Sequence, residues 1–150
     1  MEYNSYKKLG ITLILSLIIM YGVMFLNVDD ASHIYLSLTR LYMALLMVCP
    51  MALLMISMMG KMYPKKSLNN MINLLAVAVF IGALIGLRTQ TPIGDRQYMK
   101  AMIPHHSSAI LTSKHASIKD PEVKKLSESI IESQERESSE MKAILERMDK

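Results

Sequence analysis

The sequence of 150 residues contains a single cysteine, Cys49. One cysteine excludes an intrachain disulfide and a cysteine-rich metal cluster. Because Cys49 lies within an apolar stretch, we expect a buried and unreactive thiol. The sequence also lacks a complete zinc motif such as HExxH, a glycine-rich phosphate loop and a nucleophile placed beside a base. We therefore expect a protein that is not an enzyme.

The polar C-terminal region has no excess charge of either sign. Residues 92–150 carry ten Lys/Arg and ten Asp/Glu, whereas residues 1–91 carry seven Lys/Arg and three Asp/Glu. The formal net charge of +4 therefore lies in the N-terminal part. A nucleic-acid-binding protein concentrates its basic residues on the folded polar domain. This distribution argues against nucleic acid as a partner.

Long apolar segments make up most of the N-terminal part of the chain. Hydrophobic residues account for 51% of the sequence, and the mean hydropathy is +0.25. Three segments without a charged residue, at about residues 9–26, 41–60 and 68–87, have nearly the length that a helix needs to cross the hydrocarbon of a bilayer. We therefore predict that residues 1–91 form a membrane domain with three transmembrane helices in contact with lipid.

The lysines in the short loops predict the orientation of this domain. Loops rich in Lys and Arg remain in the cytoplasm. This rule places the N-terminus and the loop with Lys61, Lys65 and Lys66 inside, and residues 27–39 together with the C-terminal region outside. We expect a protein of the bacterial inner (cytoplasmic) membrane whose C-terminal domain is periplasmic or otherwise extracytoplasmic.

Residues 92–150 predict two helices joined by a short turn, which form an extracytoplasmic metal-binding domain. Asp95 is the expected N-cap of a helix that ends near residue 118. Asp120 as N-cap and Pro121 at the first helical position predict a second helix that runs nearly to the C-terminus. Two helices cannot enclose a core alone. The predicted fold is therefore all-α: three transmembrane helices followed by a helical hairpin that completes a four-helix bundle by self-association, with a homodimer as the first guess.

The segment YMKAMIPHH, at residues 98–106, contains two thioethers and two imidazoles within eight residues. Thioether sulfur suits Cu(I), and imidazole suits copper, zinc, iron or nickel. Helical spacing places Met99, Met102 and His106 on one face, whereas His105 points roughly 100° away unless the preceding proline kinks the helix. The alternative is that the methionines fill the core and the histidines are ordinary surface residues.

The second predicted helix carries polar residues in its apolar seam. Gln134 and Glu137 interrupt a seam that continues with Met141. A carboxylate and an amide in a packing seam are costly unless they find partners, and the opposing face offers Met102 and His106. This pairing predicts a metal site shared by the two helices. A polar residue that sets the packing register, or an ion pair, is the alternative for Glu137.

The second apolar segment has methionines at helical spacing. They recur at steps of three or four residues: Met43, Met47, Met51, Met55, Met58 and Met62. This stripe fits an ordinary packing face in lipid, and it also fits a ladder of soft ligands that passes Cu(I). The three segments, the stripe and the GxxxG pair Gly82 and Gly86 resemble Ctr-type copper transporters, although the inferred orientation is reversed.

The motif MIPHH followed by QxxExxxM resembles the family called domain of unknown function 305, a ferritin-like helical group with CopM-type copper-binding members. The resemblance covers about residues 94–148. It implies a four-helix-type bundle and copper as the bound metal, with Cu(I) favoured over other transition metals. The residues that match the family's ligand positions are Met99, Met102, His105, His106 and Met141.

Further residues complete the expected site. Glu137 joins the ligands because of its place in the seam, and three residues are expected as weaker ligands or outer groups: Asp95, Gln134 and Thr112. Soluble members of the family often continue the motif as HHxxAxxM, whereas this chain has Thr112 at the last position. One soft ligand of those members is therefore missing here.

These features predict a membrane-anchored copper-binding protein. It would sequester Cu(I), deliver it to other copper-handling proteins or confer copper tolerance outside the cytoplasm. Two alternatives remain: a copper transporter or channel that uses the methionine stripe, and a metal-free helical oligomerisation module.

Overall fold

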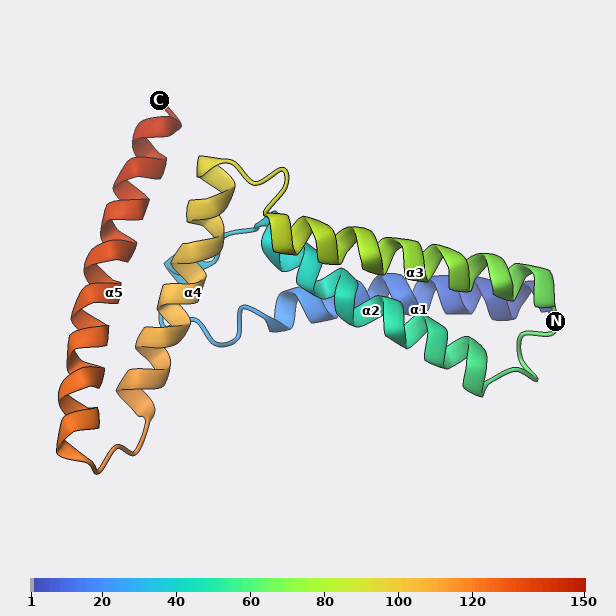
Figure 1. Cartoon of the computed structure of the whole chain (residues 1–150), viewed down its shortest axis with the longest axis horizontal. Helices are drawn as coiled ribbons and strands as arrows, with labels where there is room; N and C mark the ends of the chain where they lie inside the picture. The colour runs from blue at the N-terminus through green and yellow to red at the C-terminus, as the bar shows by residue number, and fades with distance from the viewer. Residues whose placement is uncertain (1) are drawn as a thin grey trace. The chain divides into compact units, whose positions relative to one another are not determined.

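The computed structural model describes residues 2–150 and the side chains of residues 4–150. In this part of the chain the regular elements are all helical, as predicted, and no strand occurs. The elements, shown in Figure 1, are α1 (Glu2–Val23), η1 (Ala31–His33), α2 (Leu38–Met58), α3 (Lys66–Thr89), α4 (Asp95–His115) and α5 (Pro121–Met148).

The chain divides into two compact units. Unit 1 comprises the chain up to Val23 together with residues 39–92, and unit 2 comprises residues 24–38 and 93–150. Residues 24–38, which connect α1 to α2, thus belong to the same unit as α4 and α5. We call this segment the strap. Its association with the C-terminal helices is not apparent from the sequence.

Unit 1 contains three helices that are long and apolar enough to cross a membrane: Asn4–Val23, Leu38–Met58 and Lys66–Thr89. The first ends three residues earlier than expected, because the chain turns after Val23 and Phe25 is buried in unit 2. The third is longer than expected, with 24 residues. A helix of this length can cross the hydrocarbon of a bilayer, which requires about twenty residues.

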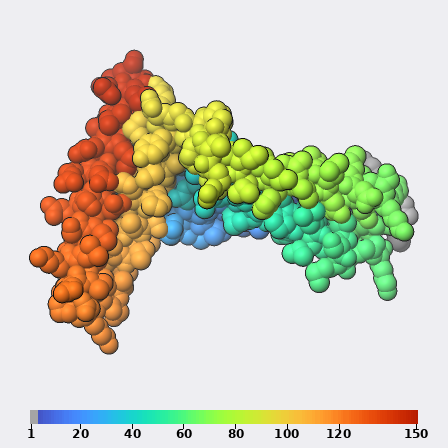
Figure 2. All heavy atoms as spheres, viewed as in Figure 1, coloured from blue at the N-terminus to red at the C-terminus, as the bar shows by residue number. Residues whose placement is uncertain are grey.

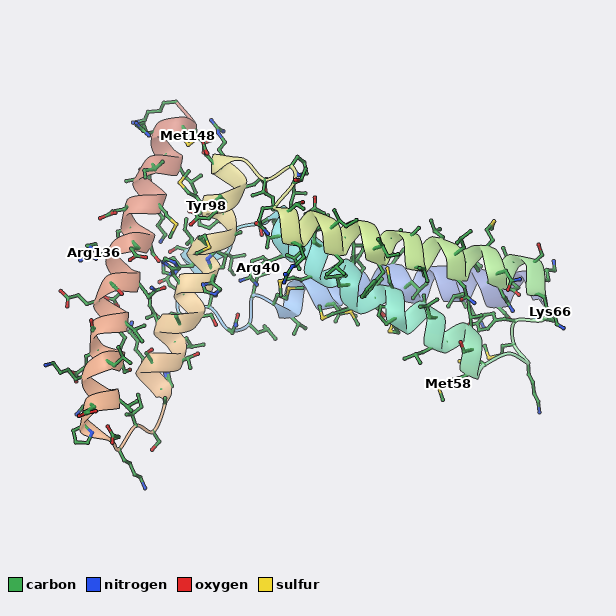
Figure 3. All side chains as sticks on the ribbon, in the orientation of Figure 1. Arg40, Met58, Lys66, Tyr98, Arg136 and Met148 are labelled. Carbon is green, nitrogen blue, oxygen red and sulfur yellow. The ribbon has the colours of Figure 1, made fainter. Side chains whose placement is uncertain are left out.

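Small and apolar side chains bring the helices of unit 1 together. One cluster of buried residues contains Cys49 and Ala52 from α2 and Ala76 from α3. Cys49 is buried and free, as predicted. At Gly86 the backbone of α3 approaches the ring of Tyr42, since a Cβ atom on this glycine would lie 2.9 Å from Tyr42 Cζ. Figure 3 shows many other side chains of these helices projecting outward, as lipid-facing residues do.

Unit 2 is built on α4 and α5, which lie side by side in Figures 1 and 2. The start of α5 is as predicted: the Asp120 carboxylate accepts hydrogen bonds from the backbone N–H groups of Glu122 and Val123, and Pro121 is the first helical residue. The predicted cap of α4 is wrong. Gly94 occupies the N-cap position, so Asp95 lies in the first turn instead.

The core of unit 2 is formed by α4, which is buried on more than one side. Met99 and Ile103 pack against Leu145 of α5, and Tyr35 of the strap packs against the same cluster. Ser107 is fully buried although it is polar. The strap explains this burial, because it covers a face of α4 that a pair of helices would leave open to solvent.

Much of the apolar seam of α5 remains uncovered within one chain. Val123 is 49% exposed and Leu126 is 60% exposed, whereas the buried positions of this helix are Ser127, Ser138 and Leu145. Exposed leucine and valine at helical spacing are available for packing against another helix.

The two glycines of the GxxxG pair have different surroundings, which a matched pair of substitutions tests. Gly86→Ala places a methyl group against the Tyr42 ring, whose hydroxyl donates a hydrogen bond to the Thr91 carbonyl. Gly82→Ala meets nothing within 4 Å. We expect Gly86→Ala to cost about 1–3 kcal/mol of unfolding free energy, and Gly82→Ala less than about 0.5 kcal/mol.

Thermal unfolding of the full-length protein in detergent micelles measures both variants. Equal losses of stability in the two variants would contradict the close approach at Gly86.

Candidate metal site

A groove of about 280 Å³ lies between α4 and α5. Its wall brings together residues from three turns of each helix: Tyr98, Met102 and His106 from α4, and Glu137, Glu140, Met141 and Ile144 from α5. Met102 and His106 are four residues apart, as are Glu137 and Met141. Residues at this spacing lie on the same face of a helix. The helices therefore present two thioethers, one imidazole and two carboxylates to the same groove.

His106 is the most unusual residue of the groove. Only 9% of its side chain is exposed, and its Nδ1 atom is buried without a hydrogen-bond partner. The carboxylate oxygen Oε2 of Glu137 lies 3.6 Å from Nδ1, which is close enough for electrostatic attraction and too far for a hydrogen bond. A buried polar atom without a partner destabilises the protein by about 1–3 kcal/mol. This nitrogen is therefore available to a ligand.

Burial also determines the charge of His106. Its pKa is lowered from the ordinary value of a histidine, mainly because burial disfavours the charged imidazolium. The negative charge of Glu137 acts in the opposite direction, and His105 adds slightly to the lowering. The neutral imidazole, which has a lone pair for a metal ion, is thus the favoured form near neutral pH.

Met99 and His105 do not line this groove. Met99 is buried in the apolar cluster with Ile103 and Leu145, where it fills the core. Met141 packs against that cluster and also lines the groove, so it connects the two environments. The side chain of His105 is exposed, and its ring centroid is 6.1 Å from that of His106.

The three residues predicted as outer groups also lie outside the groove wall. Asp95 is exposed in the first turn of α4, and Gln134 is half-buried on α5. The Thr112 hydroxyl donates a hydrogen bond to the Ser108 carbonyl of its own helix. The groove wall also contains three residues that the sequence pattern did not predict, Tyr98, Glu140 and Ile144, although each lies one turn from a predicted ligand.

The methionine stripe of α2 lies largely on the surface of unit 1. Met43 and Met47 are 44% and 43% exposed, and Met58, the last residue of α2, is exposed as well. Met62 is also exposed, but it lies in the turn after α2, so the predicted helical stripe ends at Met58. Met51 and Met55 are half-buried. A metal path along this stripe would therefore need a second chain to enclose it.

Nitrogen and oxygen ligands do not form a metal cluster by themselves. Among the residues that the structure describes, no group of three or more His, Cys, Asp or Glu side chains is placed to hold a metal ion.

The fold and the groove define an all-helical protein with three helices apolar enough to cross a membrane and a polar helical unit. Residues 82–145 match the family described as Domain of unknown function (DUF305). The chain is 40% identical over 124 residues to the uncharacterized protein L153 of Acanthamoeba polyphaga mimivirus, and the alignment covers 79% of this chain and 77% of the relative. The alignment extends beyond the 82–145 segment and includes part of the apolar helices. The chain belongs to the DUF305 family. No solved structure matches it.

Burial and the charge of Glu137 shift the pKa of His106 in opposite directions, which a titration can test. Replacing Glu137 by Gln removes the negative charge that raises the pKa of His106, so we expect this pKa to fall further. NMR titration of the His106 ring in the full-length protein measures the change.

Glu140→Gln is the matched control, since Glu140 lines the same groove, whereas the groups that shift the His106 pKa are Glu137 and His105 together with burial. A fall of equal size in both variants, or none in Glu137→Gln, would contradict the pairing of His106 with Glu137.

Proposed function

We propose that this protein is a membrane-anchored copper-binding protein whose polar unit sequesters Cu(I) or delivers it to other copper-handling proteins. Met102, His106 and Met141 are the proposed ligands, with Glu137 as an additional donor. The three apolar helices anchor the chain in lipid. The bound ion is cargo, and no catalytic turnover is involved.

The observation that carries this proposal is the buried, unpartnered Nδ1 atom of His106 in a groove that also contains two methionines. Thioether and imidazole together form a soft donor set, which favours Cu(I) over hard cations. Zinc sites are usually built from Cys, His and carboxylate ligands. The described part of the chain contains no group of three or more such residues in a suitable arrangement.

The alternative role of methionine as core filler applies to one of the predicted ligands and not to the others. Met99 is 6% exposed within an apolar cluster, so packing alone explains it. Met102 and Met141 are half-buried and form part of the groove wall beside a histidine and two glutamates. Core packing alone does not explain why these two thioethers share a groove with buried His106.

The proposal includes self-association of the polar unit into a four-helix bundle. The exposed Val123 and Leu126 of α5 support this arrangement, because a second copy would cover apolar surface that one chain leaves in water. Tyr98 and Ile144, which line the groove, are also exposed. A homodimer is the simplest assembly that buries these side chains.

The proposal also places the polar unit outside the cytoplasm of a bacterial inner membrane. The lysine-rich turn between α2 and α3 favours this orientation. Three membrane crossings would put residues 24–38 and 93–150 on the same side of the bilayer. The fact that these two segments form one compact unit is consistent with that topology.

Anaerobic titration with Cu(I) against a competing chelator tests the metal site in the full-length protein. We expect His106→Gln and Met102→Leu each to weaken Cu(I) binding by at least about tenfold, because each removes a proposed ligand. His115→Gln is the matched control, since His115 is exposed at the end of α4.

Wild-type affinity in both ligand variants would contradict the site. So would a wild-type protein that binds no more Cu(I) than a double variant carrying both His106→Gln and Met102→Leu.

Fusion of reporter proteins after Lys150 tests the orientation in bacterial cells. We expect an alkaline phosphatase fusion to be active and a green fluorescent protein fusion to be dark, because the first reporter matures outside the cytoplasm and the second inside. The reverse pattern would contradict the extracytoplasmic location and leave the copper site itself untouched.

A further inference from the structure

One buried hydroxyl group on α4 contacts the strap at two places. Ser107 is 0% exposed, and its Oγ atom accepts a hydrogen bond from the backbone N–H of Asp29 at 2.7 Å. The Nδ1 atom of His33 lies 2.8 Å from the same oxygen. Nearby, the Asn27 side chain donates a hydrogen bond to the Ser108 hydroxyl on the surface. The serine is therefore shared between the backbone and the histidine of the strap.

Two lysines add contacts to the strap from both helices. Lys114 of α4 lies 3.0 Å from the Asp29 carboxylate and 3.2 Å from the Glu135 carboxylate. Lys142 of α5 donates a hydrogen bond to the Ser32 hydroxyl at 2.9 Å. Exposed contacts of this kind contribute little to stability, because water and salt screen the charges. The strap thus depends more on its buried contacts, which are the hydrogen bond to Ser107, the packing of Tyr35 and the hydrogen bond from Leu38 to Gln97, than on its surface contacts.

His33 is half-buried and lies among charges from every element that packs around it. It lines a pocket of about 320 Å³ between the strap, α4 and α5. Ile110, Ser138 and Ser139 complete the wall of this pocket. The charged groups around His33 are Asp29 and Asp30 of the strap, Lys114 of α4, and Glu135 and Lys142 of α5.

The balance of these influences favours the neutral form of His33. Burial lowers the pKa of His33 most, Lys142 lowers it further, and Asp30 and Asp29 raise it by less. When the strap leaves the helices, His33 enters water, where a histidine titrates near about pH 6.5. The docked strap therefore binds fewer protons than the free strap. Docking is fully stable above about pH 6.5 and weakens as the pH falls below that value.

We propose that residues 24–38 are a detachable strap, held on α4 and α5 while His33 is neutral and released when His33 is protonated. Release uncovers the hydroxyl of Ser107, which directly follows His106 on α4. This inference does not rest on copper binding, since none of the contacts from which it is argued involves Met102, His106 or Met141.

Hydrogen exchange of the full-length protein in detergent micelles tests the strap directly. We expect the protection of strap peptides, corrected for intrinsic exchange rates, to fall several-fold between pH 7.5 and pH 5.5. In His33→Gln, which cannot become charged, protection should not depend on pH. His115→Gln is the control and should behave as the wild type does, because His115 contacts its own helix through the Leu111 carbonyl.

NMR titration of the His33 ring gives a second measurement, which remains decisive even if His33→Gln prevents docking at every pH. We expect the pKa of His33 to be lower in the wild type than in Ser107→Ala, which removes the shared hydroxyl. Each unit of difference corresponds to about a tenfold change in the docking equilibrium. Identical titration in the two proteins would overturn the proposal, as would equal strap protection at both pH values.

Discussion

Helix α4 is packed against α5 through Met99 and Ile103 and against the strap through Ser107, and the rest of unit 2 depends on this double coverage. A helix buried on two sides has its rotation fixed, because a turn about its axis would expose apolar groups and leave Ser107 without partners. The same fixed rotation directs Met102 and His106 into the groove. The strap, although distant in sequence, is therefore part of the structure that holds the candidate site.

The groove combines the burial of a histidine with donor atoms that suit a metal ion. Packing against α5 excludes water from His106, which destabilises the charged ring and leaves Nδ1 without a partner. A metal ion that accepts the lone pair of this nitrogen would compensate for the loss, and the thioethers of Met102 and Met141 supply donors that need no deprotonation. Glu137 would offset part of the positive charge. Such a site would hold a soft cation in surroundings that disfavour protonation of its imidazole.

Some of this structure was predictable from the sequence, and the remainder depended on contacts between distant segments. Helix length in unit 1 follows from apolar runs, and the start of α5 follows from Asp120 and Pro121, since both signals are local. Helical spacing alone placed Met102 and His106 on one face. It could not determine that Met99 would fill the core, because that depends on where Leu145 packs. The docking of the strap was not predictable, since this short segment mixes apolar and polar side chains without a clear periodicity and acquires its place through contacts with distant residues such as Ser107.

X-ray absorption spectroscopy of the purified full-length protein after anaerobic loading with one equivalent of Cu(I) tests the central claim most directly. The account predicts a copper environment that contains both sulfur and imidazole nitrogen, and it predicts loss of the sulfur contribution when Met102 and Met141 are replaced by leucine. Copper bound only by oxygen and nitrogen, or a sulfur signal unchanged in that double variant, would contradict it.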